Sequence, residues 1–331
     1  MPAATPRHRV PAQPATDYDV MIVGAGSAGL SAALVLGRCL RPVLVCDGGA
    51  PRNRPSPAVQ GFLTRDGTHP EELIRLGREQ LAPYKSVEVR EARVTNIEVF
   101  KRYFRLTLEG STGHTTTYTT RKVLLATGVD DELPPLDGMR DLWGRGVLHC
   151  PYCHGWEVRD QRIGILGTHP MSAHQAMLFH QWSRDITFFS GGRPIDEQDR
   201  VSLAALGIPI EERRISGVAA DGGRVVGVEV DDDEVIDLDA VVVATRLTVG
   251  VEPYAAIGLE AVDHPVGTVI PTDEMGATPV PGVWAAGNCA DLMAQVGAAA
   301  AQGARAAQQI NASLIMADLE KAIEVRDGTR V

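Results

Sequence analysis

The chain reads Asp19-Val20-Met21-Ile22-Val23-Gly24-Ala25-Gly26-Ser27-Ala28-Gly29 close to its start, and this stretch decides the fold. Its apolar first half predicts a short buried strand, and its Gly-x-Gly-x-x-Gly second half predicts a tight turn into a helix. A helical stretch, Leu30 to Leu40, follows, and a second apolar run, Val43 to Cys46, then ends at Asp47. Strand, glycine turn, helix, strand and acid in this order are typical of a unit that binds a dinucleotide.

Each glycine of the turn has a physical task. Gly24 permits the tight turn, Gly26 lets the backbone approach a pyrophosphate, and Gly29 lets the helix pack on the strand. The pyrophosphate is expected at the helix N-terminus, beside Ser27-Ala28, where free N–H groups point outward. Asp47 follows Gly29 by 18 residues, which is the expected place for a carboxylate that binds the ribose.

Length, composition and charge bound the class of protein. The 331 residues allow two domains, and 44% hydrophobic with 22% charged residues is a normal globular balance. The net charge, 32 − 42 = −10, argues against a basic face for nucleic acid or for an anionic membrane. No apolar run approaches the roughly 18 residues of a spanning helix, so we expect neither a nucleic-acid nor a membrane partner.

The first residues and the cysteines indicate the compartment. Residues 1–16 are rich in Pro and Ala and lack the apolar region of a signal peptide, which predicts a disordered lead-in and a cytoplasmic protein. Five cysteines are too scattered for a disulfide scaffold. In a reducing compartment a close pair of cysteines is more often catalytic or metal-binding than structural.

The close pair stands in His149-Cys150-Pro151-Tyr152-Cys153-His154. Attachment of a c-type haem is one interpretation, because Cys-x-x-Cys-His is present, but that chemistry requires export. A zinc site would need two further ligands at suitable spacing, and no second Cys-x-x-Cys occurs. We therefore expect no metal and interpret the pair as a thiol–disulfide redox couple.

Four motifs now stand in a fixed order: Gly24-x-Gly26-x-x-Gly29, Ala126-Thr127-Gly128, Cys150-Pro151-Tyr152-Cys153 and Gly282-Val283-Trp284-Ala285-Ala286-Gly287-Asn288. Together they resemble the flavin-dependent thioredoxin reductase family over nearly the whole chain. The resemblance implies an α/β fold of two Rossmann-like dinucleotide-binding domains of the three-layer ββα type, the second inserted in the first. It implies an FAD-binding domain at 17–130 and 253–331, and an inserted domain at 131–252 that resembles an NADPH domain.

The resemblance also implies the site residues. Cys153 is expected next to the flavin, Cys150 exchanges with substrate, and His154 stands where ordinary thioredoxin reductases carry an acid/base Asp. A helix from Gln295 to about Ile310 is expected to direct its positive end at the flavin. The residues expected to contact FAD are Gly24, Gly26, Ser27, Ala28, Gly29, Asp47, Asn53, Ala126, Thr127, Gly128, Gly287, Asn288, Gln295 and Val296.

Two departures from the reductase pattern concern NADPH. The second glycine motif reads Gly167-Thr168-His169-Pro170-Met171-Ser172, in which His169 replaces a glycine and Pro170 lacks an N–H. After the strand Ile186 to Phe189, where His-Arg-Arg usually clamps the 2′-phosphate, the chain reads Ser190-Gly191-Gly192-Arg193. Electrons are therefore not expected to enter from a nicotinamide.

These departures favour a dithiol oxidase like those of gliotoxin- and holomycin-type biosynthesis. Such an enzyme closes a disulfide in a small sulfur-rich metabolite, passes electrons from the Cys pair to FAD and then to O2, and releases H2O2. A thioredoxin-like disulfide reductase driven by NAD(P)H or ferredoxin, and a non-catalytic flavin redox sensor, are the alternatives. The expected partners are a small dithiol, O2 and a second copy of the chain in a homodimer. Tyr152, Trp143 and Trp156 are candidates for the wall of an apolar substrate pocket, with core packing as the alternative for the two tryptophans.

Overall fold

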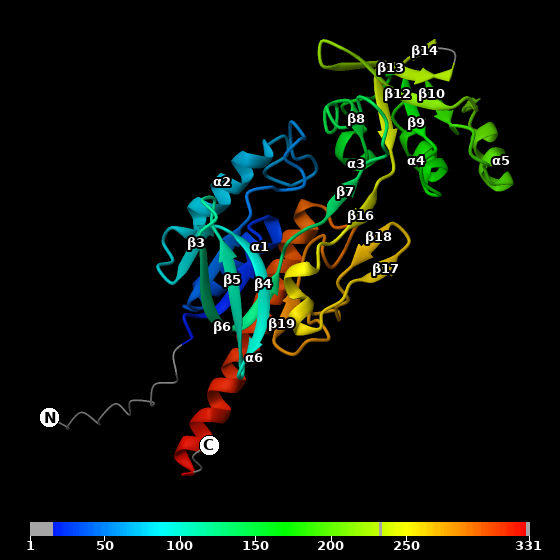
Figure 1. The fold of residues 1–331 in the computed structure, drawn as a ribbon. Coiled ribbons are helices and arrows are strands. Elements are labelled where there is room, and N and C mark those ends of the chain that lie inside the picture. Colours follow the sequence, from blue (N-terminus) through cyan, green and yellow to red (C-terminus); the bar gives the residue numbers. More distant parts are fainter. Residues whose placement is uncertain (1–15, 232–233, 329–331) are drawn as a thin grey trace.

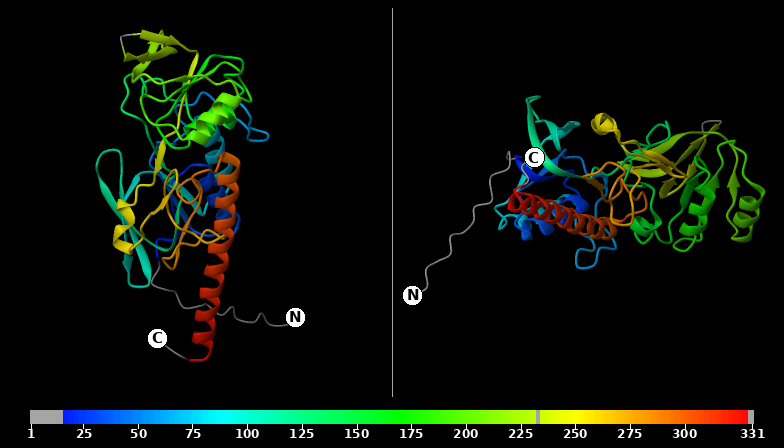
Figure 2. Two further views of the ribbon diagram at one scale, coloured as in Figure 1. Left: turned by 90° about the vertical axis from the view of Figure 1, so that its right-hand side faces the viewer. Right: turned by 90° about the horizontal axis from the view of Figure 1, so that it is seen from below.

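A computed structural model of the chain describes residues 16–231 and 234–328. The lead-in expected at residues 1–16 lies, except for Thr16, outside the described residues. Two bodies are joined by a pair of connecting strands (Figure 1), and a long helix runs along one side of the first body (Figure 2).

The first body is built on a sheet of seven strands in the order β3-β2-β1-β6-β5-β4, with β19 paired to β6. The strands are β1 (Tyr18–Val23), β2 (Val43–Asp47), β3 (Val87–Glu91), β4 (Arg93–Phe100), β5 (Tyr103–Glu109), β6 (Thr115–Leu125) and β19 (Val283–Ala285). Strands β3, β2, β1, β6 and β19 are parallel, while β4 and β5 form an antiparallel extension. The turns that follow β1, β6 and β19 therefore meet at one edge of the sheet.

Three helices accompany this sheet: α1 (Ser27–Arg38), α2 (Pro70–Leu81) and α6 (Val296–Arg326). Small apolar residues let α1 and α6 pack closely on one face, over a core that they share with β1, β2 and β6. At the crossing, a Cβ built on Gly303 would lie only 2.0 Å from the carbonyl oxygen of Ala28. Only glycine at this position allows α6 to lie so close to the first turn of α1.

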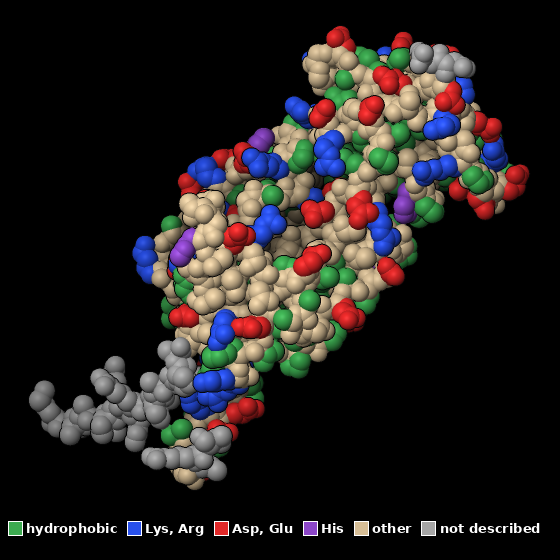
Figure 3. Space-filling model, viewed as in Figure 1, with side chains coloured by type: hydrophobic (Ala, Val, Ile, Leu, Met, Phe, Trp, Pro, Cys, Tyr) green, Lys and Arg blue, Asp and Glu red, His purple; other side chains and the backbone are tan. Residues whose placement is uncertain are grey.

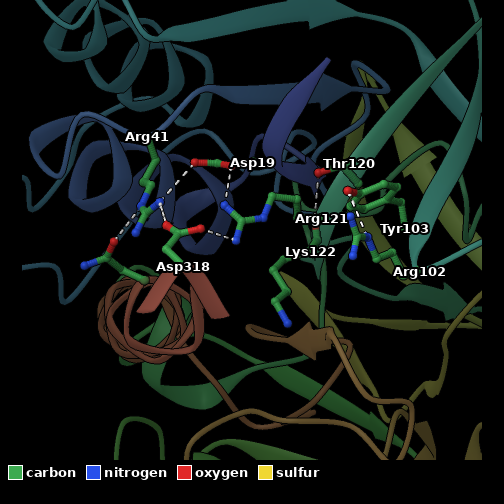
Figure 4. A network of polar contacts seen from close by, with 9 residues as sticks. Asp19, Arg41, Arg102, Tyr103, Thr120, Arg121, Lys122 and Asp318 are labelled. Atoms are coloured by element: carbon green, nitrogen blue, oxygen red, sulfur yellow. Dashed lines mark hydrogen bonds and ion pairs between the residues drawn. The ribbon is translucent and has the colours of Figure 1, made fainter. Parts of the chain in front are cut away.

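Helix α6 runs well past Ile310, where the alanine-rich pattern predicted its end, and an ion-pair cluster accounts for the difference (Figure 4). Asp318 of α6 accepts from Arg41 at 3.2 Å and from Arg121 at 2.6 Å. The same two arginines hold Asp19 of β1 at 3.2 and 3.0 Å. These contacts come from distant parts of the chain, so helix propensity alone did not reveal the second half of the helix.

The second body has its own parallel sheet, in the order β11-β10-β9-β15-β8. Its strands are β8 (Val147–Leu148), β9 (Ile163–Leu166), β10 (Ile186–Phe189), β11 (Ile210–Glu211) and β15 (Ala240–Val243). Its helices are α3 (Pro151–His154), α4 (Ser172–Phe179) and α5 (Glu197–Ala205). Side chains of α4 and α5 fill one face of the sheet.

An antiparallel sheet of three strands covers the other face of the second body. It consists of β12 (Ile215–Asp221), β13 (Arg224–Val230) and β14 (Glu234–Asp237). Antiparallel sheet, parallel sheet and helices form three layers. The predicted α/β class with Rossmann-like parallel sheets is thereby confirmed.

The chain leaves the first body through β7 (Asp130–Glu132) and returns through β16 (Arg246–Thr248), and these strands pair antiparallel. After β16 come the 3-10 helix η2 (Glu252–Ile257) and the strands β17 (Val262–His264) and β18 (Gly267–Val269). The two connecting strands lie side by side between the bodies (Figure 1). The chain before β7 and the chain after η2 therefore build the first body together.

Candidate active site

The turn after β1 is as tight as its glycines predicted. Gly24 has φ +108°, and a Cβ there would meet the carbonyl oxygen of Ala126 at 2.2 Å. A Cβ on Gly29 would meet the carbonyl oxygen of Gly24 at 1.9 Å. A side chain at either glycine would push the turn, the helix and the strand apart.

The N-terminus of α1 is open. Gly26 is the extended residue before the helix, no side chain caps it, and a Cβ there would meet no atom within 4 Å. The first N–H bonded within the helix is that of Leu30, to the carbonyl of Gly26 at 2.9 Å. In the described part of the chain, the N–H groups of Ala25 to Gly29 have no acceptor. This turn, which includes Ser27 and Ala28, fits the pyrophosphate of FAD.

Asp47 ends β2 beside this turn, because the N–H of Gly24 bonds to the carbonyl of Cys46 at 2.8 Å. Its carboxylate accepts from the N–H of Gly49 at 2.8 Å and pairs with Arg78 of α2. The sequence did not reveal Arg78 as a partner, because the pairing bridges 31 positions and two elements. Asp47 thus lies beside the turn where a ribose is expected, and Arg78 already pairs with its carboxylate.

Two further turns meet the first. Ala126, Thr127 and Gly128 follow β6, and the N–H of Ala126 bonds to the carbonyl of Val23 at 2.8 Å. Gly128 has φ +71° and open space where a Cβ would stand. Gly287 follows β19 with φ +79°, and a Cβ there would lie 3.1 Å from the Cβ of Ala28. The predicted contacts from three separate motifs thus share one edge of the sheet.

Asn288 uses its side-chain N–H groups internally. Its Nδ2 lies 3.1, 3.3 and 2.9 Å from the carbonyl oxygens of Asp291, Leu292 and Ala294. Its Oδ1 is left as the atom that can accept from a ribityl hydroxyl. Gln302, for which no motif predicted a role, accepts from the N–H of Gly287 at 3.0 Å and so fixes this turn.

Helix α6 begins beside the same turn, with Gln295 before it and Val296 as its first residue. Gln295 is extended and its helix end has no side-chain cap, and the first N–H bonded within the helix is that of Ala299. This helix end, like that of α1, is open to an anionic group.

Among the residues expected to contact FAD, Asn53 has the least support from the structure. It lies in the loop after β2, and its carbonyl accepts from the N–H of Ser56 at 3.0 Å. Its side chain has no hydrogen-bond partner within the described ranges.

The cysteine pair lies at the start of α3. Cys150 precedes this short helix, and a disulfide joins Cys150 to Cys153 with Cα atoms 5.3 Å apart. Gly155 follows, and a Cβ there would meet the ring of Trp182 at 2.6 Å, so α3 packs closely on the helix layer. Tyr152 and Trp156 are both 65% exposed, so the core-packing alternative is wrong for Trp156.

His154 is set up as a neutral base. The hydroxyl of Ser56 lies 2.8 Å from the carbonyl of Ala58 and 3.3 Å from Nε2 of His154. Because the hydroxyl hydrogen goes to Ala58, we assign the N–H to Nε2 and the lone pair to Nδ1. Nδ1 is buried and has no partner in the part of the chain described.

Burial lowers the pKa of His154, so the imidazole is neutral at pH 7. The negative charge of Glu157 raises this pKa, and the backbone carbonyl of Cys150 raises it less, but burial outweighs both. His154 is therefore a neutral imidazole whose buried Nδ1 has no partner among the described residues. Ser56, its contact at Nε2, was not found from the sequence.

A buried ion pair ties the loop after β2 to the connecting strands near the cysteines. Arg52 donates to both oxygens of Asp131, at 2.6 and 2.8 Å, and Thr245 donates to the same carboxylate at 2.7 Å. Burial alone would raise the pKa of Asp131, but the hydrogen bonds from Arg52 outweigh it and the pKa is lowered. His149, just before Cys150, is neutral as well, because burial and then Arg52 lower its pKa.

The second glycine motif is closed by its own residues. The N–H groups of Gly167, Thr168 and Ser172 bond to backbone carbonyls at 2.7, 2.8 and 2.9 Å. The N–H of His169 bonds to Oγ of Ser172 at 3.2 Å, and the N–H of Met171 bonds to Nδ1 of His169 at 3.1 Å. Pro170 has no N–H. No N–H of this turn is left for a phosphate.

Arg193, the one arginine in the segment that follows β10, also has a partner. Arg193 donates to the carbonyl of Thr168 at 2.7 Å, so its side chain bridges the two loops where a nucleotide would otherwise lie. Ser190 before it is buried, and its N–H bonds to the carbonyl of Glu211 at 2.8 Å.

Two findings apply to residues 16–231 and 234–328 as a whole. No group of three or more His, Cys, Asp or Glu side chains there is arranged to hold a metal ion. None of the described helices combines the length and the apolar character needed to cross a membrane.

Comparison with known proteins gives concordant results. The model of the pyridine nucleotide-disulphide oxidoreductase family matches residues 18–303. Thioredoxin reductase sirT of Leptosphaeria maculans is 31% identical over 323 residues, which cover 91% of this chain and 96% of that protein. A probable thioredoxin reductase of Arthroderma benhamiae is 40% identical over 172 residues, which cover 50% of this chain and 40% of that protein.

Among solved structures, that of HlmI is 39% identical with a TM-score of 0.87, over 94% of this chain and 97% of that one. The resemblance drawn from the four motifs is thereby confirmed. The chain belongs to the pyridine nucleotide-disulphide oxidoreductase family, as an FAD-dependent oxidoreductase of the thioredoxin reductase-like kind.

Proposed function

We propose that the protein is an FAD-dependent dithiol oxidase that closes an intramolecular disulfide in a small sulfur-rich metabolite. The turn from Gly167 to Ser172 carries this proposal, because none of its N–H groups is left for a pyrophosphate. Arg193, bonded to Thr168, supports it further. If a nicotinamide does not bind here, the thiol pair is the entry for electrons.

The two bodies would have different tasks, FAD binding in the first and thiol exchange in the second. Residues 17–130 with 253–331 would form the FAD-binding domain, and residues 131–252 the inserted domain with the cysteine pair. The open N–H groups of α1 would hold the pyrophosphate, Asp47 the ribose, and Oδ1 of Asn288 the ribityl chain. Bound FAD would accept two electrons from the cysteine pair and pass them to O2, which becomes H2O2.

The sulfur chemistry begins when His154 takes the proton of one substrate thiol. The thiolate attacks Sγ of Cys150, the Cys150–Cys153 bond breaks, and its electron pair stays on Cys153. The second substrate thiolate then attacks the substrate sulfur of the mixed disulfide and releases Cys150. The substrate has lost two protons and two electrons and gained one S–S bond, and the enzyme holds two thiols.

Access to the pair supports a substrate that is small and partly apolar. Tyr152 and Trp156 flank the cysteines and expose most of their rings to solvent. Such rings can receive an apolar metabolite without rearranging the core. We further propose that the enzyme works in the cytoplasm as a homodimer.

Anaerobic reduction tests the proposal directly. We expect dithiothreitol to bleach the flavin absorbance, NADPH to leave it unchanged, and air to restore it with one H2O2 per flavin. Rapid bleaching by NADPH would refute the proposal in favour of a reductase. Reduction by neither reagent would favour a redox sensor.

A further inference from the structure

A cavity of about 660 Å³ lies between the two bodies and is lined by residues of both. The loop after β2 forms one wall, β7 a second, and the segment before β8 a third. Its volume is in the range of pockets that hold small molecules. Figure 3 shows basic and acidic side chains mixed around the middle of the molecule, where the bodies meet.

The charges of this cavity fall into two groups. Arg52 and Arg54 of the lining are already paired, with Asp131 and Glu71. Arg140, Arg145, Asp130 and Asp141 also line it, and all four are exposed and have no ion-pair partner among the described residues, although Arg145 donates to the backbone carbonyl of Asp141 at 2.9 Å. Two cations and two carboxylates at the cavity are thus free to pair with a ligand.

The remaining wall is apolar. Trp143, Leu133 and Val129 line the cavity between the charged groups. Trp143 is half-buried and is the largest apolar side chain of this lining. Charges of both signs around an apolar wall suit a ligand with an ammonium, a carboxylate and a short apolar body.

The cavity adjoins the redox site at the loop after β2. Pro55 lines the cavity, and the next residue, Ser56, contacts His154 at 3.3 Å. The Arg52–Asp131 pair, which joins that loop to β7, lies close enough to His149, next to Cys150, to shift its pKa. A ligand in the cavity would therefore lie near the acid/base group and the exchanging thiol.

We propose that this cavity binds the charged ends of a small zwitterionic peptide that carries the two thiols. Arg140 and Arg145 would receive the carboxylate, and Asp130 and Asp141 the ammonium group. This inference rests on the proposed function, since it names the class of dithiol that the oxidase accepts.

Binding can be measured without any redox step. The probe is Ser-Gly-Gly-Ser with free ends, titrated calorimetrically into the FAD-loaded protein, against the same peptide acetylated and amidated. We expect the free-ended peptide to bind about fivefold more tightly, as two partly exposed ion pairs allow. Arg140→Gln and Asp141→Asn should each reduce this preference to about twofold, and the double variant should bring the two affinities together.

Arg224→Gln is the matched control, because Arg224 is an exposed arginine at the start of β13 and does not line the cavity. It should keep the wild-type preference. Equal affinity for both peptides, or no binding of either, would overturn the proposal, and so would loss of the preference in Arg224→Gln.

Turnover separates this proposal from the proposed function. With Cys-Gly-Gly-Cys as substrate, free ends should lower KM about fivefold relative to capped ends. If dithiothreitol reduces the flavin but the free and capped peptides do not differ, only the cavity assignment fails. If the serine peptides differ in affinity and no dithiol reduces the flavin, only the oxidase assignment fails.

Discussion

Gly303→Ala tests whether the close crossing of α6 over α1 builds the FAD site. A Cβ at this position would lie 2.0 Å from the carbonyl oxygen of Ala28, whereas carbon and oxygen normally stay about 3.3 Å apart. The helices must separate by roughly 1 Å, and overpacking of this kind costs about 1–3 kcal/mol. Alanine regains about 0.5–1 kcal/mol through helix propensity. The net loss of stability is then at most about 2.5 kcal/mol, and with an unfolding entropy of about 0.7 kcal/mol/K for a chain of this length we expect a melting temperature lower by roughly 1–4 °C.

The same displacement moves Ala28 in the first turn of α1, so the purified variant should also hold less FAD per protein. Gly77→Ala is the control, because Gly77 is likewise helical but its Cβ would meet only the flexible end of Leu30, at 2.9 Å. It should melt within about 2 °C of the wild type. A Gly303→Ala protein that melts no lower than the wild type and retains all its FAD would refute the reasoning.

Further predictions concern the site itself. Cys150→Ser should leave a free thiolate on Cys153 and a long-wavelength absorbance band that Cys153→Ser lacks, and identical spectra would contradict their assigned roles. His154→Gln should remove the acidic limb of the kcat/KM profile, which in the wild type lies below pH 6.5 because burial lowers the pKa of His154; an unchanged profile would exclude it as the base. The pKa of His149 is lowered too, so His149 binds a proton at a higher pH in the unfolded chain than in the folded one. The free energy of unfolding should therefore fall as the pH drops below about 6.5. Constant stability in urea titrations from pH 7 to pH 5 would contradict this. Asn288→Asp should place a carboxylate against three carbonyl oxygens and weaken FAD retention by about 1–3 kcal/mol, so that FAD is released at a lower urea concentration. Release at an unchanged urea concentration would show that these hydrogen bonds are dispensable.

The features that could be predicted from the sequence are those that depend on local steric constraints, above all the glycines of the first turn. Gly24 and Gly29 are required because a Cβ would strike backbone a few positions away or in a neighbouring strand, and the glycine spacing records that requirement. Arg78, Ser56 and Gln302 escaped prediction, since each acts on a site residue at least 15 positions away. Arginine, serine and glutamine are common surface residues, so only the fold distinguishes these three from the others.

Both glycine motifs of the chain join a strand to a helix, and they differ in whether the backbone N–H groups of the turn already have acceptors. At the first turn the N–H groups of Ala25 to Gly29 face no acceptor of the described chain, so an anion completes the structure. At the second, His169 and Ser172 supply the acceptors themselves, and Arg193 adds a bond across the loop. A nucleotide would have to displace these bonds before making its own, and it would still find no N–H at Pro170. Restoring glycine at position 169 alone would remove one of these obstacles and leave the others, so we expect that change by itself not to create a nicotinamide site.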